Sequence, residues 1–395
     1  MKERGPERRK GSGRRAGETG ARPLEGPPLV TCPHCQSLVP AGDFCGHCGA
    51  HLISDSKRRT HAFAATPTEH VAHVSIITTL FPHLPHRRGG PFRLALIAGG
   101  AVVLVLAALH LFAPATAAAV FVLPALYLIY LYEVEIYGSE PWLVIGATMV
   151  MGAVLGFVSA YLFGGSLATR LMTGDRGTAF FLEAIVIPLV GQLLMLAGPL
   201  FLFTFRRQFR EPLDGLAFGS ASALGFTLTS SLTFLWPLLT EPSLGTGSTV
   251  GWAVRLTQAG LLTMLINACT TGVVSASIWL ERSERKRAIR PWHSNLVATL
   301  IVAFGTQLLL GVNAFLEQDL ALDVGVLVVA TIALLLYLRL VIHDALLVEG
   351  AEHEIGPDSM CPECHRIVPT MAFCPACGAA RAAAPKGKPR VARGA

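Results

Sequence analysis

Long apolar stretches are the feature that most limits what this chain can fold into. About 20 apolar residues are enough to cross a bilayer as a helix. About eight such stretches occur, roughly over residues 94–112, 115–132, 142–163, 181–204, 216–239, 256–279, 295–316 and 323–342. A backbone in lipid must satisfy its own hydrogen bonds, so each stretch is predicted to be a helix. The sequence therefore predicts an all-α polytopic membrane bundle.

The composition favours the same class of protein. Hydrophobic residues make up 52% of the chain and charged residues only 15%, whereas soluble domains carry about 25% charged residues. Gly, Ala, Ser and Thr recur inside the apolar stretches, as in "GATMVMGAVLGFVSA" and "GSASALGFTLTSS". Small residues let membrane helices approach closely, so we expect a compact bundle.

Positive charge collects in alternate loops and predicts the orientation. Arginine and lysine crowd the segment before the first stretch and the loops after the fourth and sixth, at Arg87, Arg88, Arg93, Arg206, Arg207, Arg210, Arg282, Arg285, Lys286, Arg287 and Arg290. The loops "TEPSLGTGSTVG" and "EQDLALD" carry no positive charge. Cytoplasmic loops are enriched in Lys and Arg. We therefore expect a multi-pass protein of the cytoplasmic membrane with both termini in the cytoplasm.

The strongest motif is a repeat that occurs once on each side of the apolar region. "TCPHCQSLVPAGDFCGHCGA" and "MCPECHRIVPTMAFCPACGA" align without gaps, and each has the pattern C-x2-C-x9-C-x2-C. Two Cys-x2-Cys pairs present four thiolates in the arrangement that structural Zn²⁺ prefers. The predicted ligands of two structural zinc ions are Cys32, Cys35, Cys45, Cys48, Cys361, Cys364, Cys374 and Cys377.

Other uses of these cysteines fit the sequence less well. Disulfides are disfavoured in the reducing cytoplasm, and four Cys ligands close a zinc site against catalysis. The two zinc ribbons are expected on the same side of the membrane, and their similarity suggests that they pack together. Small zinc ribbons usually bind a protein, a nucleic acid or a neighbouring ribbon. Cys269 lies alone in the sixth stretch and is interpreted as a small packing residue.

The ends of the chain complete the predicted domain organisation. Zinc ribbons at 30–52 and 359–380 flank a membrane domain at 93–343, with linkers at 53–92 and 344–358 and disordered basic tails at 1–29 and 381–395. The tails are expected to add solubility and to fix the orientation; contact with anionic lipid or nucleic acid is the alternative. In the first linker, apolar and basic residues predict contact with the membrane interface.

Two stretches of the membrane region resemble a known family. "LYEVEIYGSEPWLVIGATMVMGAVLGF" is similar to the segment before the catalytic region of PrsW intramembrane proteases. "IPLVGQLLMLAGPLFLFTFRRQFREPLDGLAFGSASALGFTLTSS" is similar to that region itself, most closely in "FREPLDGLAFGSASALGF". The resemblance covers roughly residues 120–315 and excludes both cysteine repeats. It implies a buried metal-dependent site for peptide hydrolysis.

The motif positions of that family are largely replaced in this chain. Its members carry Glu-Glu-x-x-Lys in one helix and Phe-x-x-x-Glu in a second. Gly191 and Gln192 stand at the paired glutamates, and Met195 at the lysine. Phe226 is kept, but Ser230 replaces the second motif's glutamate. The later histidine positions fall within "MLINACTTG" and "LLLGVNAF", and neither stretch contains a histidine.

The residue types themselves also argue against a catalytic metal in the membrane. Such a metal needs His, Asp or Glu ligands and one open position. In the third to eighth stretches, the only acidic residue well inside is Glu183, near one end, and none contains histidine. The polar residues that remain are neutral: Gln192, Ser230, Ser231, Gln258, Asn267, Gln307 and Asn313. Amides in a bundle usually hydrogen-bond across helices. The alternative is a degenerate pocket for a peptide or lipid, formed by Gln192, Ser230, Asn267 and Asn313.

The functional prediction is a catalytically degenerate relative of PrsW proteases. It acts as a membrane scaffold or sensor whose two cytoplasmic zinc ribbons recruit a protein partner. Three alternatives stay open: an active PrsW-like intramembrane metalloprotease, a transporter or lipid-handling protein, and a membrane-tethered nucleic-acid-binding protein. The sequence predicts no oligomeric state.

Overall fold

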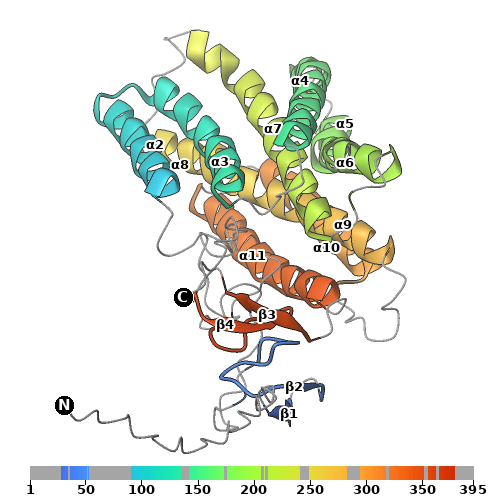
Figure 1. The fold of residues 1–395 in the computed structure, drawn as a ribbon. Coiled ribbons are helices and arrows are strands. Elements are labelled where there is room, and N and C mark those ends of the chain that lie inside the picture. The colour runs from blue at the N-terminus through green and yellow to red at the C-terminus, as the bar shows by residue number, and fades with distance from the viewer. Residues whose placement is uncertain are drawn as a thin grey trace, which may run out of the picture.

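A computed structural model shows a helical bundle with a small β-hairpin module at each end of the chain (Figure 1). The structure describes residues 28–33, 36–50, 52, 90–134, 142–172, 176–205, 209, 212–240, 249–282, 294–316, 320–350, 355–361 and 364–378. The expectations for both basic tails and for most of the first linker lie outside these residues, as does Cys35.

The helices follow the predicted apolar stretches. They are α2 (Gly90–Ala108), α3 (Phe112–Val134), α4 (Trp142–Met172), α5 (Arg176–Phe180), α6 (Ile187–Phe205), α7 (Pro212–Thr240), α8 (Thr249–Thr257), α9 (Thr263–Arg282), α10 (Leu296–Phe315) and α11 (Leu320–Gly350). Two π-helical segments, η1 (Phe181–Val186) and η3 (Gln258–Leu262), join α5 to α6 and α8 to α9. Each of these junctions continues the helix without a break.

Seven helical segments are long and apolar enough to cross a membrane. This confirms the prediction of a mostly helical multi-pass membrane protein. The remaining expected span is the helix α7, which has 29 residues but is not among the seven. Its many Gly, Ser and Thr residues, as in "GSASALGFTLTSS", lower its mean hydropathy.

Helix α7 lies at the centre of the bundle, where it packs most extensively against α4 and α9 (Figure 1). Glycines make the close approach of α4 possible. A Cβ on Gly152 would lie 2.0 Å from the backbone oxygen of Ser222, and a Cβ on Gly225 would lie 2.0 Å from that of Met149. The small residues noted in the sequence are therefore where the helix backbones meet.

Helices α2 and α3 lie at the periphery of the bundle. Only 6% of the segment Pro91–Ala108 in α2 is buried, and the helix packs against α3. Helix α3 in turn contacts α7, where the Tyr127 hydroxyl donates to the backbone oxygen of Ala217 at 3.0 Å. The face of α2 turned away from α3 is the apolar surface that lipid covers in a membrane protein.

Each cysteine repeat begins with an antiparallel hairpin. In the first, β1 (Leu29–Thr31) pairs with β2 (Leu38–Pro40), and in the second, β3 (Gly356–Met360) pairs with β4 (Ile367–Thr370). Helix α11 continues to Gly350 and so occupies part of the stretch at 344–358 that the sequence predicts to be a linker. In this part of the helix, Ala345 is only 1% exposed and belongs to the hydrophobic core cluster of the bundle.

Candidate metal centres and intramembrane site

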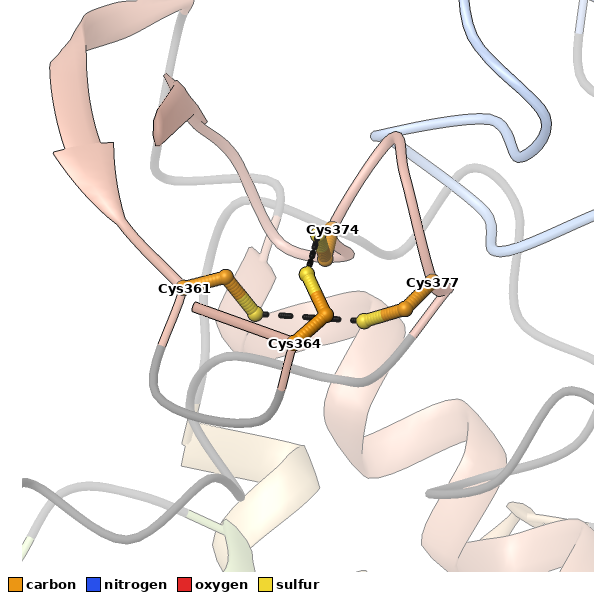
Figure 2. A group of neighbouring side chains, drawn as sticks. All are labelled: Cys361, Cys364, Cys374 and Cys377. Carbon is orange, nitrogen blue, oxygen red and sulfur yellow. Dashed lines mark hydrogen bonds between the residues drawn. The ribbon is translucent and has the colours of Figure 1, made fainter. Parts of the chain in front are cut away.

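The C-terminal repeat brings its four cysteines together. The sulfur atoms of Cys361, Cys364, Cys374 and Cys377 all lie within 4.8 Å of one another (Figure 2). The closest pairs cross the cluster: Cys361 and Cys377 are 3.8 Å apart, and so are Cys364 and Cys374. Cys361 and Cys374 are buried. Each residue offers one sulfur, which makes four ligand atoms around one point.

Tight turns after each cysteine pair aim these sulfurs inward. The amide of His365 donates to the Cys361 carbonyl at 2.9 Å, and the Cys361 amide donates to the Arg366 carbonyl at 2.8 Å. The backbone of His365 has φ 59° and that of Gly378 has φ 72°. Such left-handed conformations let the chain reverse beside each thiol pair, and at Gly378 the absence of a Cβ removes the steric cost.

The N-terminal repeat has the same local structure. Its turns place Gln36 at φ 57° and Gly49 at φ 73°, in the positions equivalent to His365 and Gly378. The sulfurs of Cys32, Cys45 and Cys48 lie within 4.8 Å of one another. Two copies of one sequence pattern thus fold the same way, and Cys35 is the expected fourth ligand.

One thiol in each cluster is predisposed to ionise. Hydrogen bonds from the thiols of Cys361 and Cys377 lower the pKa of Cys374 to about 3, against the opposing effect of burial. A hydrogen bond with the Cys48 thiol lowers the pKa of Cys45 to about 5, also against burial. The thiolate is the form of cysteine that binds metal. Each cluster is therefore an electrostatically suitable place for a cation.

A polar network lies inside the membrane domain, at the glutamine in the middle of α6. Gln192 is fully buried. Its amide oxygen accepts from the Thr270 hydroxyl at 3.2 Å and from Nε2 of Gln307 at 3.1 Å. Its own Nε2 donates to the Thr271 hydroxyl at 3.3 Å. These bonds tie α6 to α9 and α10.

The network extends to α7 through a second amide. Nε2 of Gln307 also donates to Oδ1 of Asn267 at 2.9 Å, and Nδ2 of Asn267 donates to the Thr227 hydroxyl at 2.9 Å. Four helices are thereby joined by side chains that are neutral at every pH a cell experiences. Amides and hydroxyls satisfy one another here, as buried polar groups must in lipid.

Comparison with known proteins decides the family. The sequence model of the PrsW family of intramembrane metalloproteases matches residues 140–338, half of the chain. The chain belongs to the PrsW family. No curated protein matches it significantly. No solved structure does either.

The PrsW-family match runs from α4 into α11, where it ends at Leu338, and leaves out α2, α3 and both cysteine modules. The resemblance aligns Gly191 and Gln192 with the paired glutamates of the family motif, and Gln192 is the centre of the polar network. Met195, at the lysine position, is 2% exposed and accepts a weak hydrogen bond from the Thr271 hydroxyl at 3.8 Å. The family's motif position is therefore filled by neutral, mutually bonded groups.

The structure brings together only two of the four residues predicted for a degenerate pocket. Gln192 and Asn267 are linked through Gln307. The Ser230 hydroxyl instead donates to the backbone oxygen of Thr227 at 3.2 Å, within its own helix. Nδ2 of Asn313 donates to a carboxylate oxygen of Asp323 near the start of α11.

A second cluster surrounds that carboxylate. Asp323 also accepts from Nε2 of Gln258, which lies in the π-helical segment η3. Sequence reasoning missed Asp323, because it stands at the first position of the last apolar stretch. It expected Gln307 to hydrogen-bond across helices, as the structure shows, but left it out of the candidate pocket. Only the side-chain directions across neighbouring helices reveal the partners of either residue.

The two cysteine clusters are the only sets of three or more His, Cys, Asp or Glu residues, within the part of the chain that the structure describes, whose ligand atoms lie close enough to share an ion. The residues around Gln192 contribute no carboxylate or imidazole to such a set. A hydrolytic metal requires ligands of those types. The residues present around Gln192 therefore do not fit the metal that the family name implies, whereas the cysteine clusters fit a structural one.

Proposed function

We propose that this chain is a PrsW-family membrane protein without peptidase activity, whose two zinc ribbons recruit a protein partner in the cytoplasm. One observation carries the proposal. At the place where the family motif would hold paired carboxylates, the buried amide of Gln192 is bonded to Thr270, Thr271 and Gln307. Groups already bonded to one another offer no open coordination position for a substrate or for an activated water.

The chemistry of the cysteine clusters supports zinc. Four thiolates at one point match the closed tetrahedral coordination of structural Zn²⁺, and such sites contribute directly to folding. The modules are small, so they have few buried apolar residues of their own to stabilise them. Zinc in these clusters has a structural role and takes no part in hydrolysis.

The exposed face of the hairpins supports a protein partner. Leu38 in β2 is 64% exposed and Ile367, at the equivalent position in β4, is 74% exposed. Met360 pairs with Ile367 across the second hairpin and is 47% exposed. Each hairpin thus exposes an apolar side chain at the same position, and in the second hairpin two such side chains are adjacent, which favours a protein as the partner.

An active intramembrane metalloprotease is the second candidate, because family membership itself favours it. Metal content separates the two. The purified chain should hold about two zinc ions, and a variant with Cys32, Cys45, Cys361 and Cys374 changed to Ser should hold none. A third ion that survives in this variant and is lost on adding Gln192→Ala would establish a metal in the membrane and overturn the proposal.

Cleavage provides the second arm of the test. We expect no cleavage of dye-labelled single-span membrane peptides by the purified protein with or without added Zn²⁺. Cleavage that Gln192→Ala abolishes would assign peptidase activity to the chain. Size-exclusion chromatography of each variant shows whether the membrane domain remains folded, so that a loss of metal is interpreted only for intact protein.

A further inference from the structure

The two cysteine modules contact each other through equivalent residues. The Phe44 amide donates to the backbone oxygen of Pro375 at 3.0 Å, and the Phe373 amide donates to that of Gly46 at 2.8 Å. Phe44 corresponds to Phe373 in the aligned repeats, and Gly46 corresponds to Pro375. The pair is therefore held by two reciprocal bonds, as two copies related by a two-fold axis would be. The hypothesis that the repeats pack together is confirmed.

The side chains in this contact are complementary but not symmetric. A Cβ on Gly46 would lie 2.3 Å from the sulfur of Met371, and a Cβ on Gly42 would lie 2.6 Å from the backbone oxygen of Pro375. Met371 is the counterpart of Gly42, and Pro375 is the counterpart of Gly46. The C-terminal module thus offers two bulky residues at the positions where the N-terminal module has two glycines.

This difference determines which pairs can form. Two C-terminal modules in the same arrangement would place Met371 of one against Pro375 of the other, where no glycine makes room. Two N-terminal modules would place Gly42 against Gly46 and leave a gap, which forfeits packing contacts. Only the unlike pair fills the interface without a clash.

Three consecutive residues of the C-terminal module join this pair to the membrane domain. Met371 belongs to the core of the N-terminal module, together with Cys32, Val39 and Cys45. Ala372 and Phe373 belong instead to the core of the bundle, a cluster that also contains residues of α11. The ring of Phe373 also lies against Gly49 of the N-terminal module.

We propose that the two modules form an obligate unlike pair within one chain, in which the C-terminal module docks on α11 and the N-terminal module docks on the C-terminal one. Among the described residues, the core cluster of the N-terminal module and its backbone hydrogen bonds to other parts of the chain reach the C-terminal module alone, so in this proposal the partner module holds it at the membrane domain. The dependence is one-way: loss of the C-terminal fold releases both modules, whereas loss of the N-terminal fold leaves the C-terminal module on α11. Only the experiments with metal-ligand variants depend on the proposed function, because they assume that the two modules bind zinc.

Two distances in the full-length protein test this proposal. Spin labels attached to non-canonical residues at the exposed positions 38 and 367 measure the distance between the two modules. A second pair of labels, at 367 and 329, measures the distance from the C-terminal module to α11. Position 329 can carry a label because Val329 is 67% exposed. Pulsed-EPR should give a narrow distance distribution for both sets in the otherwise unchanged protein. Mixing singly labelled chains should give no distance between 38 and 367, and a narrow one would overturn pairing within one chain.

Substitutions at the contact should separate the pair without unfolding either module. Gly42→Val should abolish the narrow 38–367 distance while the zinc content and the 367–329 distance stay unchanged. Ala41→Val is the matched control, since Ala41 is exposed, and it should change nothing. Gly46→Met should act like Gly42→Val, and adding Met371→Gly should restore the narrow distance. An unchanged distance in Gly42→Val, or zinc loss with it, would overturn the proposal.

Metal-ligand variants then test the order of docking. Cys45→Ser should abolish the narrow 38–367 distance and keep the 367–329 distance. Cys374→Ser should abolish both. Because both distances use position 367, a third pair of labels at 38 and 329 reports the N-terminal module against α11, and Cys374→Ser should abolish its narrow distance as well. If Cys374→Ser leaves the 38–329 distance narrow, or if Cys45→Ser also releases position 367 from α11, the one-way dependence is wrong. These outcomes are independent of peptidase activity, so failure here is distinguishable from failure of the proposed function.

Discussion

At the scale of single residues, Gln192 makes hydrogen bonds to three other side chains, whereas Gln307 and Asn267 each make two in the same network. Its amide meets Thr270, Thr271 and Gln307. Replacing it with leucine keeps much of the volume but removes one hydrogen-bond partner from each of those three groups. We expect Gln192→Leu to lower the free energy of unfolding by about 1 kcal/mol, the typical scale for polar contacts between membrane helices.

Titration with a denaturing detergent, followed by circular dichroism, measures this change. Leu193→Ala is the control, because Leu193 is the next residue in α6 and is 57% exposed. We expect the control to unfold at the wild-type detergent concentration. Equal stability of Gln192→Leu and the wild type would show that the network contributes nothing to the fold.

The cysteines provide a second prediction at this scale. Cys374→Ser should remove about one zinc ion per chain, because three remaining thiolates hold the metal far less tightly than four. Cys269→Ser should remove none. Cys269 is buried in α9 and belongs to no cluster of potential ligands among the described residues. Metal analysis by mass spectrometry checks both, and equal zinc loss in the two variants would contradict the assignment.

The polar site shows what a sequence reveals about single residues and what it does not. Gln192 and Asn267 stand out as amides in apolar stretches, and the structure brings both into the network. Ser230 and Asn313 are equally polar in the sequence, yet neither belongs to it. Membership depends on which way each side chain points around its helix and on the reach of Gln307 between two partners. Neither quantity is visible before the helices are packed.

At the scale of helices, the crossing of α4 and α7 depends on glycine. A Cβ on Gly152 would overlap the backbone oxygen of Ser222, which cannot move aside as a flexible side chain can. We expect Gly152→Val to force the helices apart and to cost roughly 1–3 kcal/mol of stability. The same detergent titration measures the cost.

Gly146 provides a matched control in the same helix. A Cβ there would meet no atom within 4 Å, so Gly146→Val adds a methyl-branched side chain to a lipid-facing position. We expect wild-type stability for this variant. Equal destabilisation by the two substitutions would point to helix propensity as the cause, and would remove the packing argument.

The helices themselves were predictable, and their irregularities were not. Apolar stretches of sufficient length identified every long helix of the bundle, because length and apolarity are what a bilayer selects. The π-helical segments η1 and η3 cannot be recognised in this way, because one extra residue in a helical turn changes neither the length of an apolar stretch appreciably nor its apolarity. Their positions are of interest because η1 contains Glu183 and η3 contains Gln258, two of the few polar groups near the ends of the bundle.

At the scale of the whole molecule, contact between the two cysteine modules constrains the path of the chain through the membrane. Phe44 and Phe373 are joined across the modules by backbone hydrogen bonds. We therefore infer that both modules lie on one side of the membrane, and on that inference the chain between them crosses the membrane an even number of times. Among the described residues, seven segments meet the length and apolarity of a span, and we expect α7, the other long helix of the bundle, to provide one further crossing.

The crossing by α7 leads to a prediction about its two ends. Alkaline phosphatase inserted after Phe205, before α7, should be inactive, since the enzyme folds only in an oxidising compartment. The same insertion after Thr240, at the end of α7, should be active. Green fluorescent protein fused at either terminus should fluoresce if the arginine-rich side is cytoplasmic, as we propose from the charge of the loops.

Two identical phosphatase results would mean that α7 does not cross. The number of crossings would then be odd, and the two modules would be on opposite sides of the membrane, where the bonds between Phe44, Gly46, Phe373 and Pro375 could not form. A pair of insertions around α6, after Met172 and after Phe205, provides the internal standard, because the segment Gly177–Phe205 is apolar enough to cross without help. Since α4 and α9 pack against the Gly-, Ser- and Thr-rich surface of α7, we expect Gly152→Val also to weaken the phosphatase signal after Thr240.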